Sequence, residues 1–391
     1  MKKLFFVFAA LMMLSFQAET VKHNSHLSGL PPFKNGNAPW TRTDFEQAMR
    51  SKGVFFRGSG SLRTTQLSDR KFFGQQALEM RASYNAQNQL TRLDIIYANK
   101  GDSAKQKKVN RTISRTAKEL SGTLTKLYGP EKRKNYGMKN MQTRVSYWDA
   151  GNGEILLDFI RSEYVIVHIN MAPATPQEVE KEQFPKHIKG KDFSDNVKTN
   201  KFGDAFIPDI PMINQGSKGY CVPATVERVL RYYGITDLNM HQIADKANTG
   251  KGGGTSLNNV ISALTPVCNA TGLKKVLTGD VKLQTVKRHI DRGCPLFWVM
   301  YTNPEYEEIR NQSRRERSKY TNPKEWLKVT RKFKTPSKGG SHMCLIIGYN
   351  EKTDEIAVTN SWGDHEIQPT WVPVKIARKV SQGKTFVLMP K

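Results

Sequence analysis

The first half of the chain alternates apolar and polar positions with the periods of strands and of one long helix. Alternation over 78–84 and an apolar run over 93–97 predict two strands joined by a polar turn. Apolar residues then recur at steps of three and four from Val109 to Leu127, which predicts an amphipathic helix. Further strand-like runs cover 144–148, 154–160 and 164–170. The pattern over residues 28–172 therefore predicts a small α+β domain. Whether this domain is a propeptide or a targeting module stays open.

The second half of the chain is separated from the first by a change of pattern. Residues 173–203 mix proline with dense charge and show no apolar period, which is typical of a linker. From 204 to 391 the apolar periodicity returns, and this region predicts a second α+β domain. Two apolar runs, 342–349 and 356–359, lie on either side of a polar turn and predict a β-hairpin.

Cys221 is predicted to begin a helix. After it, apolar or aromatic residues recur at helical steps, Pro223 suits the first turn, and Gly234 suits the end. The unpaired N–H groups and the positive dipole end at a helix start favour a thiolate, which is the nucleophilic form of cysteine. Cys221 is therefore a candidate nucleophile.

The other groups that such a nucleophile needs also occur in the second half. Gln215 precedes Cys221 by six residues in a glycine-containing loop, where its amide and the Cys221 N–H can donate to an oxyanion. His342 opens the first strand of the predicted hairpin and is a candidate base. Asn360 follows the second strand, so the hairpin brings it near His342, where it can accept from the imidazole and fix its tautomer.

These residues resemble the papain-like cysteine peptidases. The resemblance rests on Gln-Gly-Ser-x-Gly-x-Cys ending at Cys221, on a histidine that opens an apolar strand, and on Asn-Ser-Trp-Gly starting at Asn360. Trp362 matches the tryptophan that shields the His–Asn contact from water in the family. The Val-Pro-Ala sequence after the nucleophile departs from the papain branch. It is more similar to the bacterial double-glycine (bacteriocin-processing) peptidases and their transporter-free relatives.

The resemblance implies a fold and an activity for residues 204–391. The fold is a papain-like α+β domain, in which a helical part carries the cysteine and an antiparallel sheet carries the histidine and the asparagine. The activity is hydrolysis of peptide bonds by a cysteine-type peptidase, with no cofactor and no metal. The roles implied are nucleophile for Cys221, base for His342, orienting amide for Asn360 and oxyanion-hole donor for Gln215.

Two alternatives to a peptidase stay open. A papain-fold protein can be catalytically silent and act as a binding or adaptor protein, because a blocked cleft is invisible in a sequence. An amidase or acyltransferase can also use the same nucleophile with a different substrate or acceptor. Peptides or proteins are the expected partners in the first reading.

The N-terminus predicts export. Two lysines precede an apolar run over 4–16, as in a secretory signal peptide, and cleavage is expected near residue 18. The expected location is secreted or periplasmic. That run is too short to span a bilayer, and no later stretch is apolar enough to do so. Four cysteines do not make a disulfide scaffold, but a Cys268–Cys294 bridge stays open in an oxidising compartment.

The chain is strongly basic, with 61 Lys+Arg against 35 Asp+Glu and a formal charge of +26. Such a balance favours acidic partners. Basic residues concentrate over 310–338, directly before His342, where they form either a lid that docks on an anionic surface or a merely solvated helix and loop. Specific nucleic-acid binding is not predicted, because aromatic residues are sparse in this stretch.

Several other polar residues are interpreted as structural. His168 lies in a strand pattern and Cys344 follows His342 on a buried strand, so both are assigned to packing. Cys294 stands at a strand entrance and is also assigned to packing. Asp364 and His365 follow the Trp362 turn and are assigned to a solvated loop.

Overall fold

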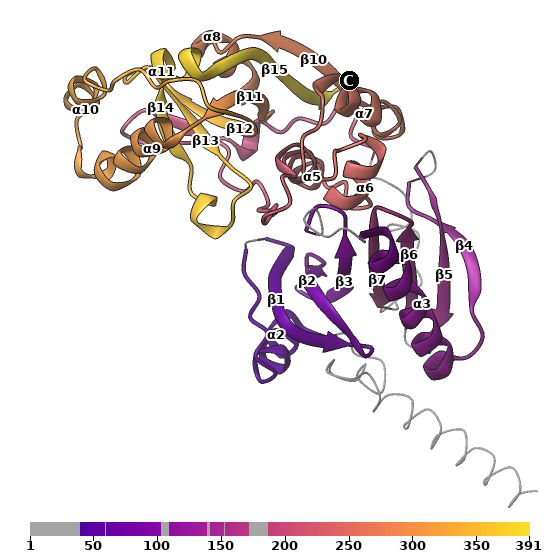
Figure 1. Ribbon diagram of the computed structural model, residues 1–391. Helices are drawn as coiled ribbons and strands as arrows, with labels where there is room; N and C mark the ends of the chain where they lie inside the picture. The colour runs from indigo at the N-terminus through magenta and orange to yellow at the C-terminus, as the bar shows by residue number, and fades with distance from the viewer. Residues whose placement is uncertain (1–39, 59, 103–108, 139–140, 152, 172–186) are drawn as a thin grey trace, which may run out of the picture. The chain divides into compact units, whose positions relative to one another are not determined.

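The computed structural model describes residues 40–58, 60–102, 109–138, 141–151, 153–171 and 187–391. The chain divides into two compact units, the first built from α2 to β7 and the second from the elements that follow (Figure 1). The predicted signal peptide and the part of the predicted linker before residue 187 lie outside the described residues. No helix in the described part of the chain is long and apolar enough to cross a bilayer.

The first unit is a seven-stranded antiparallel sheet with a long helix on one face. The strand order is β1-β2-β3-β7-β6-β5-β4, and α3 packs against β2, β3, β5, β6 and β7. The elements are α2 (Arg42–Arg50), β1 (Leu62–Phe72), β2 (Gln75–Tyr84), β3 (Leu90–Asn99), α3 (Val109–Tyr128), β4 (Lys132–Tyr136), β5 (Thr143–Asp149), β6 (Gly153–Ile160) and β7 (Tyr164–Met171). The predicted helix and five predicted strands are confirmed. The outer strands β1 and β4 were not predicted.

A network of buried charges lies on this first sheet. His168 on β7 is fully buried, and its Nδ1 lies 2.7 Å from Asp94 Oδ1, while its Nε2 lies 3.6 Å from Asp158 Oδ2. Burial alone would raise the pKa of Asp94, but Arg92 and His168 hold it well below its usual value. Buried charges are tolerated when they are paired in this way. The assignment of His168 to packing agrees with this arrangement.

The second unit combines a cluster of helices with an eight-stranded antiparallel sheet. Its helices are η1 (Ser194–Asn196), α5 (Cys221–Tyr232), α6 (Met240–Lys246), α7 (Leu257–Thr271), α8 (Leu283–Ile290), α9 (Pro304–Glu316), η2 (Arg317–Lys319), α10 (Pro323–Thr330), η3 (Asp364–Glu366) and α11 (Val374–Val380). Its strands are β8 (Lys198–Thr199), β9 (Asp204–Phe206), β10 (Leu273–Gly279), β11 (Leu296–Thr302), β12 (Gly340–Asn350), β13 (Glu355–Thr359), β14 (Thr370–Pro373) and β15 (Ser381–Pro390). The main path is β10-β15-β11-β12-β13-β14, and β9 pairs with β12. The prediction of an α+β fold is confirmed.

The C-terminal part of the predicted linker, residues 187–203, is folded. Residues 187–203 contain η1 and β8, and Ile188 is fully buried in the core of the second unit. This part of the predicted linker therefore belongs to a folded unit. The sequence did not reveal this because the segment is densely charged, its strand β8 has only two residues, and Ile188 is a single apolar residue among polar ones.

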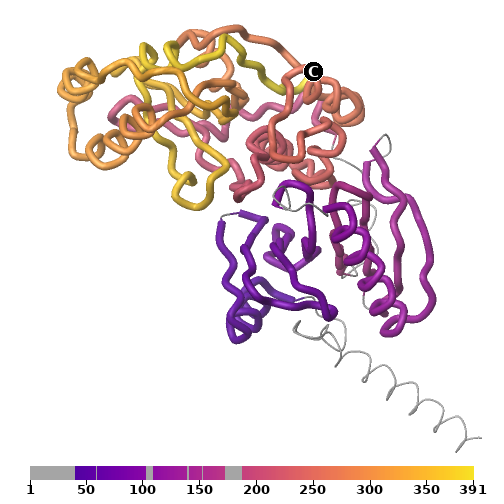
Figure 2. Tube along the Cα trace, viewed as in Figure 1, coloured from indigo at the N-terminus to yellow at the C-terminus, as the bar shows by residue number. Residues whose placement is uncertain are grey.

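Helix α5 lies beside β12, between the sheet and α6, although more than 100 residues separate α5 and β12 in the sequence (Figures 1 and 2). Its apolar residues Val226, Val229 and Leu230 are fully buried in the same core as Leu345 and Ile346 of β12. The predicted helix from Cys221 and the predicted hairpin, now β12 and β13, are confirmed. Packing of α5 on β12 places the helix start close to the strand start.

The insert between β11 and β12 forms α9, η2 and α10 and is fixed to the sheet by ion pairs. Arg317 donates to Asp204 of β9 at 2.5 Å and to Glu355 of β13 at 3.0 Å. The indole of Trp326 donates to the other oxygen of Glu355 at 2.8 Å. The carboxylates are buried, so removing their partner would leave an uncompensated charge. The insert is therefore an integral part of the domain.

Candidate active site

Cys221 is the first residue of α5, and its sulfur lies against the strand that carries His342. The side chain of the N-cap residue, Tyr220, makes no capping hydrogen bond, so it satisfies none of the N–H groups in the first turn of the helix. The backbone N–H groups of Met343, Val222 and Cys221 itself face the Cys221 sulfur as hydrogen-bond donors and lower its pKa. Met343 follows His342 directly in β12. The sulfur of Cys221 and the backbone next to His342 are thus brought together from positions 121 residues apart.

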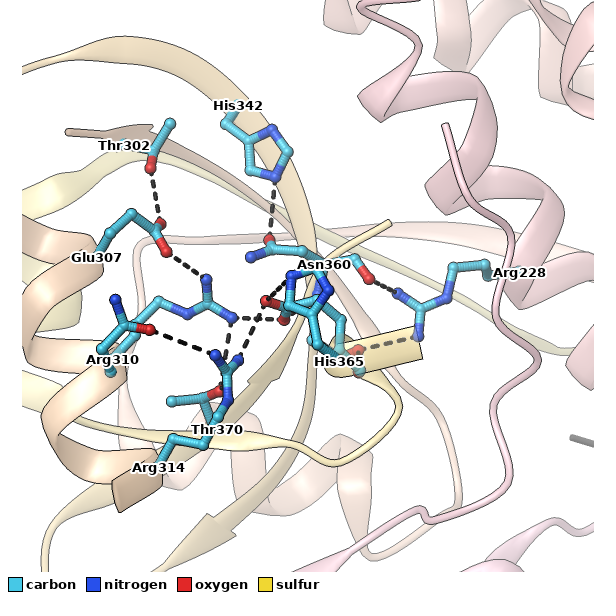
Figure 3. Close-up of polar contacts among 12 residues, drawn as sticks. Arg228, Thr302, Glu307, Arg310, Arg314, His342, Asn360, His365 and Thr370 are labelled. Atoms are coloured by element: carbon cyan, nitrogen blue, oxygen red, sulfur yellow. Dashed lines mark hydrogen bonds and ion pairs between the residues drawn. The ribbon is translucent and has the colours of Figure 1, made fainter. Parts of the chain in front are cut away.

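His342 is held by Asn360 and covered by Trp362. Its Nε2 lies 3.0 Å from Asn360 Oδ1, and only 6% of the residue is exposed (Figure 3). The Trp362 ring lies 4.8 Å from the imidazole, centroid to centroid, at an angle of 35°. Because Nε2 faces Asn360, the second ring nitrogen, Nδ1, is the one available to exchange a proton with another group. Trp362 limits the access of water to the His–Asn contact.

Burial is the largest influence on the pKa values of Cys221 and His342. Burial raises the pKa of Cys221 above its ordinary value, although the three backbone N–H groups oppose the shift. Burial also lowers the pKa of His342 to about 4; Asn360 opposes this shift and Arg310 adds to it. Thiol and imidazole are therefore both neutral near pH 7. Burial therefore opposes the thiolate that the helix N-terminus favours.

Gln215 is oriented by Ser361. Its backbone N–H donates to the Ser361 carbonyl at 2.8 Å, and its side-chain Oε1 accepts from the Ser361 hydroxyl at 2.7 Å. With the oxygen end of the amide fixed, the Nε2 end is the one left to donate. Gly219 in the intervening loop has φ +68°, and a Cβ there would lie 2.9 Å from Gly252 O, so the loop requires glycine at that position.

Arg228 joins three segments of the site. Its guanidinium donates to the Asn360 carbonyl at 2.8 Å (Figure 3) and to Thr359 Oγ1 at 3.0 Å. It also donates to the Pro211 carbonyl at 2.9 Å. Burial lowers the pKa of Arg228 to about 10, so it stays charged at neutral pH. This residue was not predicted. The available signal was an arginine two helical turns after Cys221, in a helix that is otherwise mostly apolar.

Glu366 supports Asn360 from the other side. Its Oε2 accepts the Asn360 backbone N–H at 3.2 Å and the Arg310 guanidinium at 2.5 Å, and its Oε1 accepts from Arg314 at 3.1 Å. Although burial opposes it, the two arginines hold the pKa of Glu366 below its ordinary value. Neither Glu366 nor Arg310 was predicted as part of the site. The neighbouring His365 is 61% exposed in side chain, as expected for a solvated loop.

The other cysteines have no catalytic partner in this arrangement. All four cysteines are free, so Cys268 and Cys294 are not bridged. Cys344 is buried on β12, and burial raises the pKa of its thiol well above the ordinary value. Within the described ranges, no group of three or more His, Cys, Asp or Glu residues is arranged to hold a metal ion.

The basic stretch 310–338 is divided between internal and exposed charges. Arg310, Arg314 and Arg317 pair with carboxylates of the sheet and of η3, and Arg315 pairs with Glu308 on the same helix. The exposed basic residues of the insert are Arg314, Arg315, Lys319, Lys324, Lys328, Arg331, Lys332, Lys334 and Lys338. Docking on an anionic surface stays a prediction and rests on these residues alone.

The low pKa of His342 predicts a specific loss of stability in acid. Between the ordinary histidine value of 6.5 and about 4, the unfolded chain binds a proton on this ring that the folded chain does not bind. The stabilising contribution is complete above pH 6.5 and is lost as the pH falls towards 4. We expect His342→Gln to reduce the loss of unfolding free energy between pH 7.5 and 4.5 by about 2 to 3 kcal/mol.

Urea unfolding of both proteins, followed by tryptophan fluorescence at the two pH values, measures this difference. His365→Gln is the matched control, because His365 is mostly exposed. Equal pH dependence in the wild type and in His342→Gln would show that the ring is not kept neutral by the fold.

Comparisons with known proteins find a family model and several solved structures that are similar to the second half of the chain. The model of the Peptidase_C39 like family matches residues 207–380. No curated protein matches the chain. Among solved structures, the chain is similar to the peptidase domain of Streptococcus ComA, described as a bi-functional ABC transporter involved in a quorum sensing pathway. That match has 12% identity and a TM-score of 0.31, and covers 47% of this chain and 100% of that one.

Two further solved structures show a similar partial likeness. A putative C39-like peptidase from Bacillus anthracis matches with 11% identity and a TM-score of 0.32, over 48% of this chain and 98% of that one. Xylellain, a cysteine protease from Xylella fastidiosa, matches with 12% identity and a TM-score of 0.27, over 53% of this chain and 96% of that one. Residues 207–380, which lie in the second unit with its α+β fold, are thus similar to the Peptidase_C39 like family.

Proposed function

We propose that the second unit hydrolyses peptide bonds with Cys221 as nucleophile, His342 as base and acid, Asn360 as orienting amide and Gln215 in the oxyanion hole. The observation that carries the proposal is the convergence of α5 and β12. The sulfur of Cys221 is a partner of the Met343 N–H, next to His342, while the far nitrogen of the imidazole contacts Asn360. These contacts support Nδ1 of His342 as the ring nitrogen for proton exchange with the thiol.

The neutral resting pair indicates the order of the first step. The thiol proton passes to His342 as the sulfur attacks the carbonyl carbon, so that the ion pair forms with the C–S bond and not before it. The carbonyl oxygen becomes an oxyanion, to which the Cys221 N–H and the Gln215 Nε2 donate. These two donors offset the cost of forming charge in a buried site.

The remaining steps return the site to its starting state. The imidazolium gives its proton to the amine as the C–N bond breaks, leaving a thioester on Cys221. Water then attacks the thioester, with His342 taking its proton, and the thiol is regenerated when the carboxylic acid product leaves. Asn360 and Trp362 keep the ring in one plane and one orientation through both proton transfers.

We also propose that the protein is exported. The support is the basic N-terminus followed by the apolar run over 4–16, which lies outside the described residues. N-terminal sequencing of the protein recovered outside the cytoplasm should begin near residue 19. Recovery of the intact N-terminus from the cytoplasm alone would reject export.

The first prediction for activity concerns Cys221. The wild-type chain should cleave members of a peptide library under reducing conditions, and Cys221→Ala should lower kcat/KM by a thousandfold or more, as the loss of a nucleophile does elsewhere. Cys268→Ala, which removes a buried thiol on α7, is the matched control and should retain activity. Mass spectrometry of the products measures both the cleavage and its chemistry.

Each alternative has its own outcome in the same experiment. Products trapped by an added amine, in place of free acid, would identify an acyltransferase. Alkylation of Cys221 without cleavage of any peptide by the wild type would identify a binding or adaptor protein. Full activity in Cys221→Ala would contradict the proposal outright.

The second prediction for activity concerns Ser361, whose hydroxyl fixes the oxygen end of the Gln215 amide. Gln215→Ala should lower kcat by about 10²- to 10³-fold, the usual loss of one oxyanion donor. Ser361→Ala should lower kcat by less, with KM little changed. The double variant should be no worse than Gln215→Ala alone, because Ser361 acts through Gln215. Additive losses in this double-mutant cycle would contradict that role.

A further inference from the structure

The Asn360 carboxamide lies between two groups, His342 and Arg310, that can each bind its oxygen or face its nitrogen. On one side, His342 Nε2 lies 3.0 Å from the carboxamide. On the other side lies the Arg310 guanidinium of α9 (Figure 3). If the carboxamide is turned over, its oxygen accepts from Arg310 Nη1 at 2.7 Å and from Nη2 at 3.1 Å, and its nitrogen donates to His342 Nε2 at 3.0 Å.

Arg310 favours the turned orientation. A guanidinium has only donors, so it pairs with the amide oxygen and opposes the amide nitrogen. Arg310 is 1% exposed and is fixed by Glu307 at 2.7 Å and by Glu366 at 2.5 Å, so it cannot move away easily. It also lies 5.7 Å from the centroid of the Trp362 ring, which covers His342.

The turned orientation fixes the proton of the imidazole. When the Asn360 nitrogen donates to Nε2, that nitrogen must carry a lone pair, and the proton of the neutral ring must be on Nδ1. A doubly protonated ring would place a second donor against the amide nitrogen. The charged groups that act on His342 are Arg310 on α9, which disfavours a positive ring, and Glu366 on η3, which favours it.

We propose that Arg310 is a positioning residue that holds the Asn360 oxygen and so keeps His342 in its Nδ1–H tautomer at rest. The nitrogen that must accept the Cys221 proton is then already occupied. The site becomes competent when the Asn360 carboxamide turns its oxygen to the imidazole. One proton leaves Nδ1 for solvent, and one from solvent binds Nε2, so the ring stays neutral. The insert helix α9 thereby controls the base of the reaction.

This inference rests on the proposed function for its meaning, but its first test needs no turnover. In the ¹⁵N-labelled wild-type chain at pH 7, the ¹⁵N chemical shifts of His342 should show a protonated Nδ1 and an unprotonated Nε2. His342→Gln assigns the signal. A protonated Nε2 in the resting wild type would overturn the proposal.

Two variants test the part played by Arg310. Arg310→Met removes both donors, while Glu366 keeps its partner Arg314. Asn360→Asp keeps the size of the side chain but has no donor, so one oxygen can accept from Arg310 and the other from Nε2–H. Both should move the proton to Nε2, raise the pKa of His342 by about one unit and make alkylation of Cys221 by iodoacetamide at pH 7 about tenfold faster.

Arg315→Met is the matched control, because Arg315 lies on the same helix but pairs with the exposed Glu308. It should leave the tautomer and the alkylation rate unchanged. If Arg310→Met does not fold, Asn360→Asp decides, since it retains Arg310 and its ion pairs. An unchanged Nδ1–H tautomer in folded Asn360→Asp would overturn the proposal.

The two hypotheses fail in different ways. A wild-type chain with the Nδ1–H tautomer but no peptide hydrolysis would reject the proposed function and leave the role of Arg310 intact. An active peptidase whose resting His342 carries its proton on Nε2 would reject the role of Arg310 alone.

Discussion

The arrangement of the candidate site depends on the hydrogen bonds that the buried guanidinium of Arg228 donates. It joins the helix that begins at Cys221 to the end of β13, where Asn360 lies, and to Pro211 in the segment that leads to Gln215. A charge in a protein interior is stable only when its donors are satisfied, and here two backbone carbonyls and the Thr359 hydroxyl satisfy them. The pairing of this one arginine therefore joins three chain segments that lie apart in the sequence.

The same burial sets the ionisation of the reacting groups. A helix N-terminus favours a thiolate, but it contributes only about 0.3–1 kcal/mol at an exposed site, and at Cys221 the cost of burying a charge is larger. His342 is neutral for the same reason. In the proposed reaction the site therefore has to stabilise charge that appears as the reaction proceeds. Gln215, held by Ser361, and the Cys221 N–H are the donors that we propose for this role.

Much of this was predictable from the sequence where structure follows from local pattern. The period of apolar residues predicted α3, α5 and the β12–β13 hairpin, and the residue types at Gln215, Cys221, His342 and Asn360 predicted which segments meet. Outer strand β4 is mostly exposed, with no buried residue, so it has no apolar alternation to detect. Arg310 looked like one more surface charge in a basic insert, because its partner Glu366 is 56 residues away. The effect of burial on the pKa values of Cys221 and His342 could not be read from the sequence, because burial depends on tertiary packing.

The most direct test of the account is the crystal structure of the full chain after reaction with a peptide aldehyde. The account predicts a covalent bond from the aldehyde carbon to the Cys221 sulfur. The resulting oxygen should lie within about 3 Å of both the Gln215 Nε2 and the Cys221 N, and the imidazole of His342 should face the sulfur through Nδ1. An adduct on another cysteine, or an oxygen that points away from Gln215 in an ordered site, would contradict it.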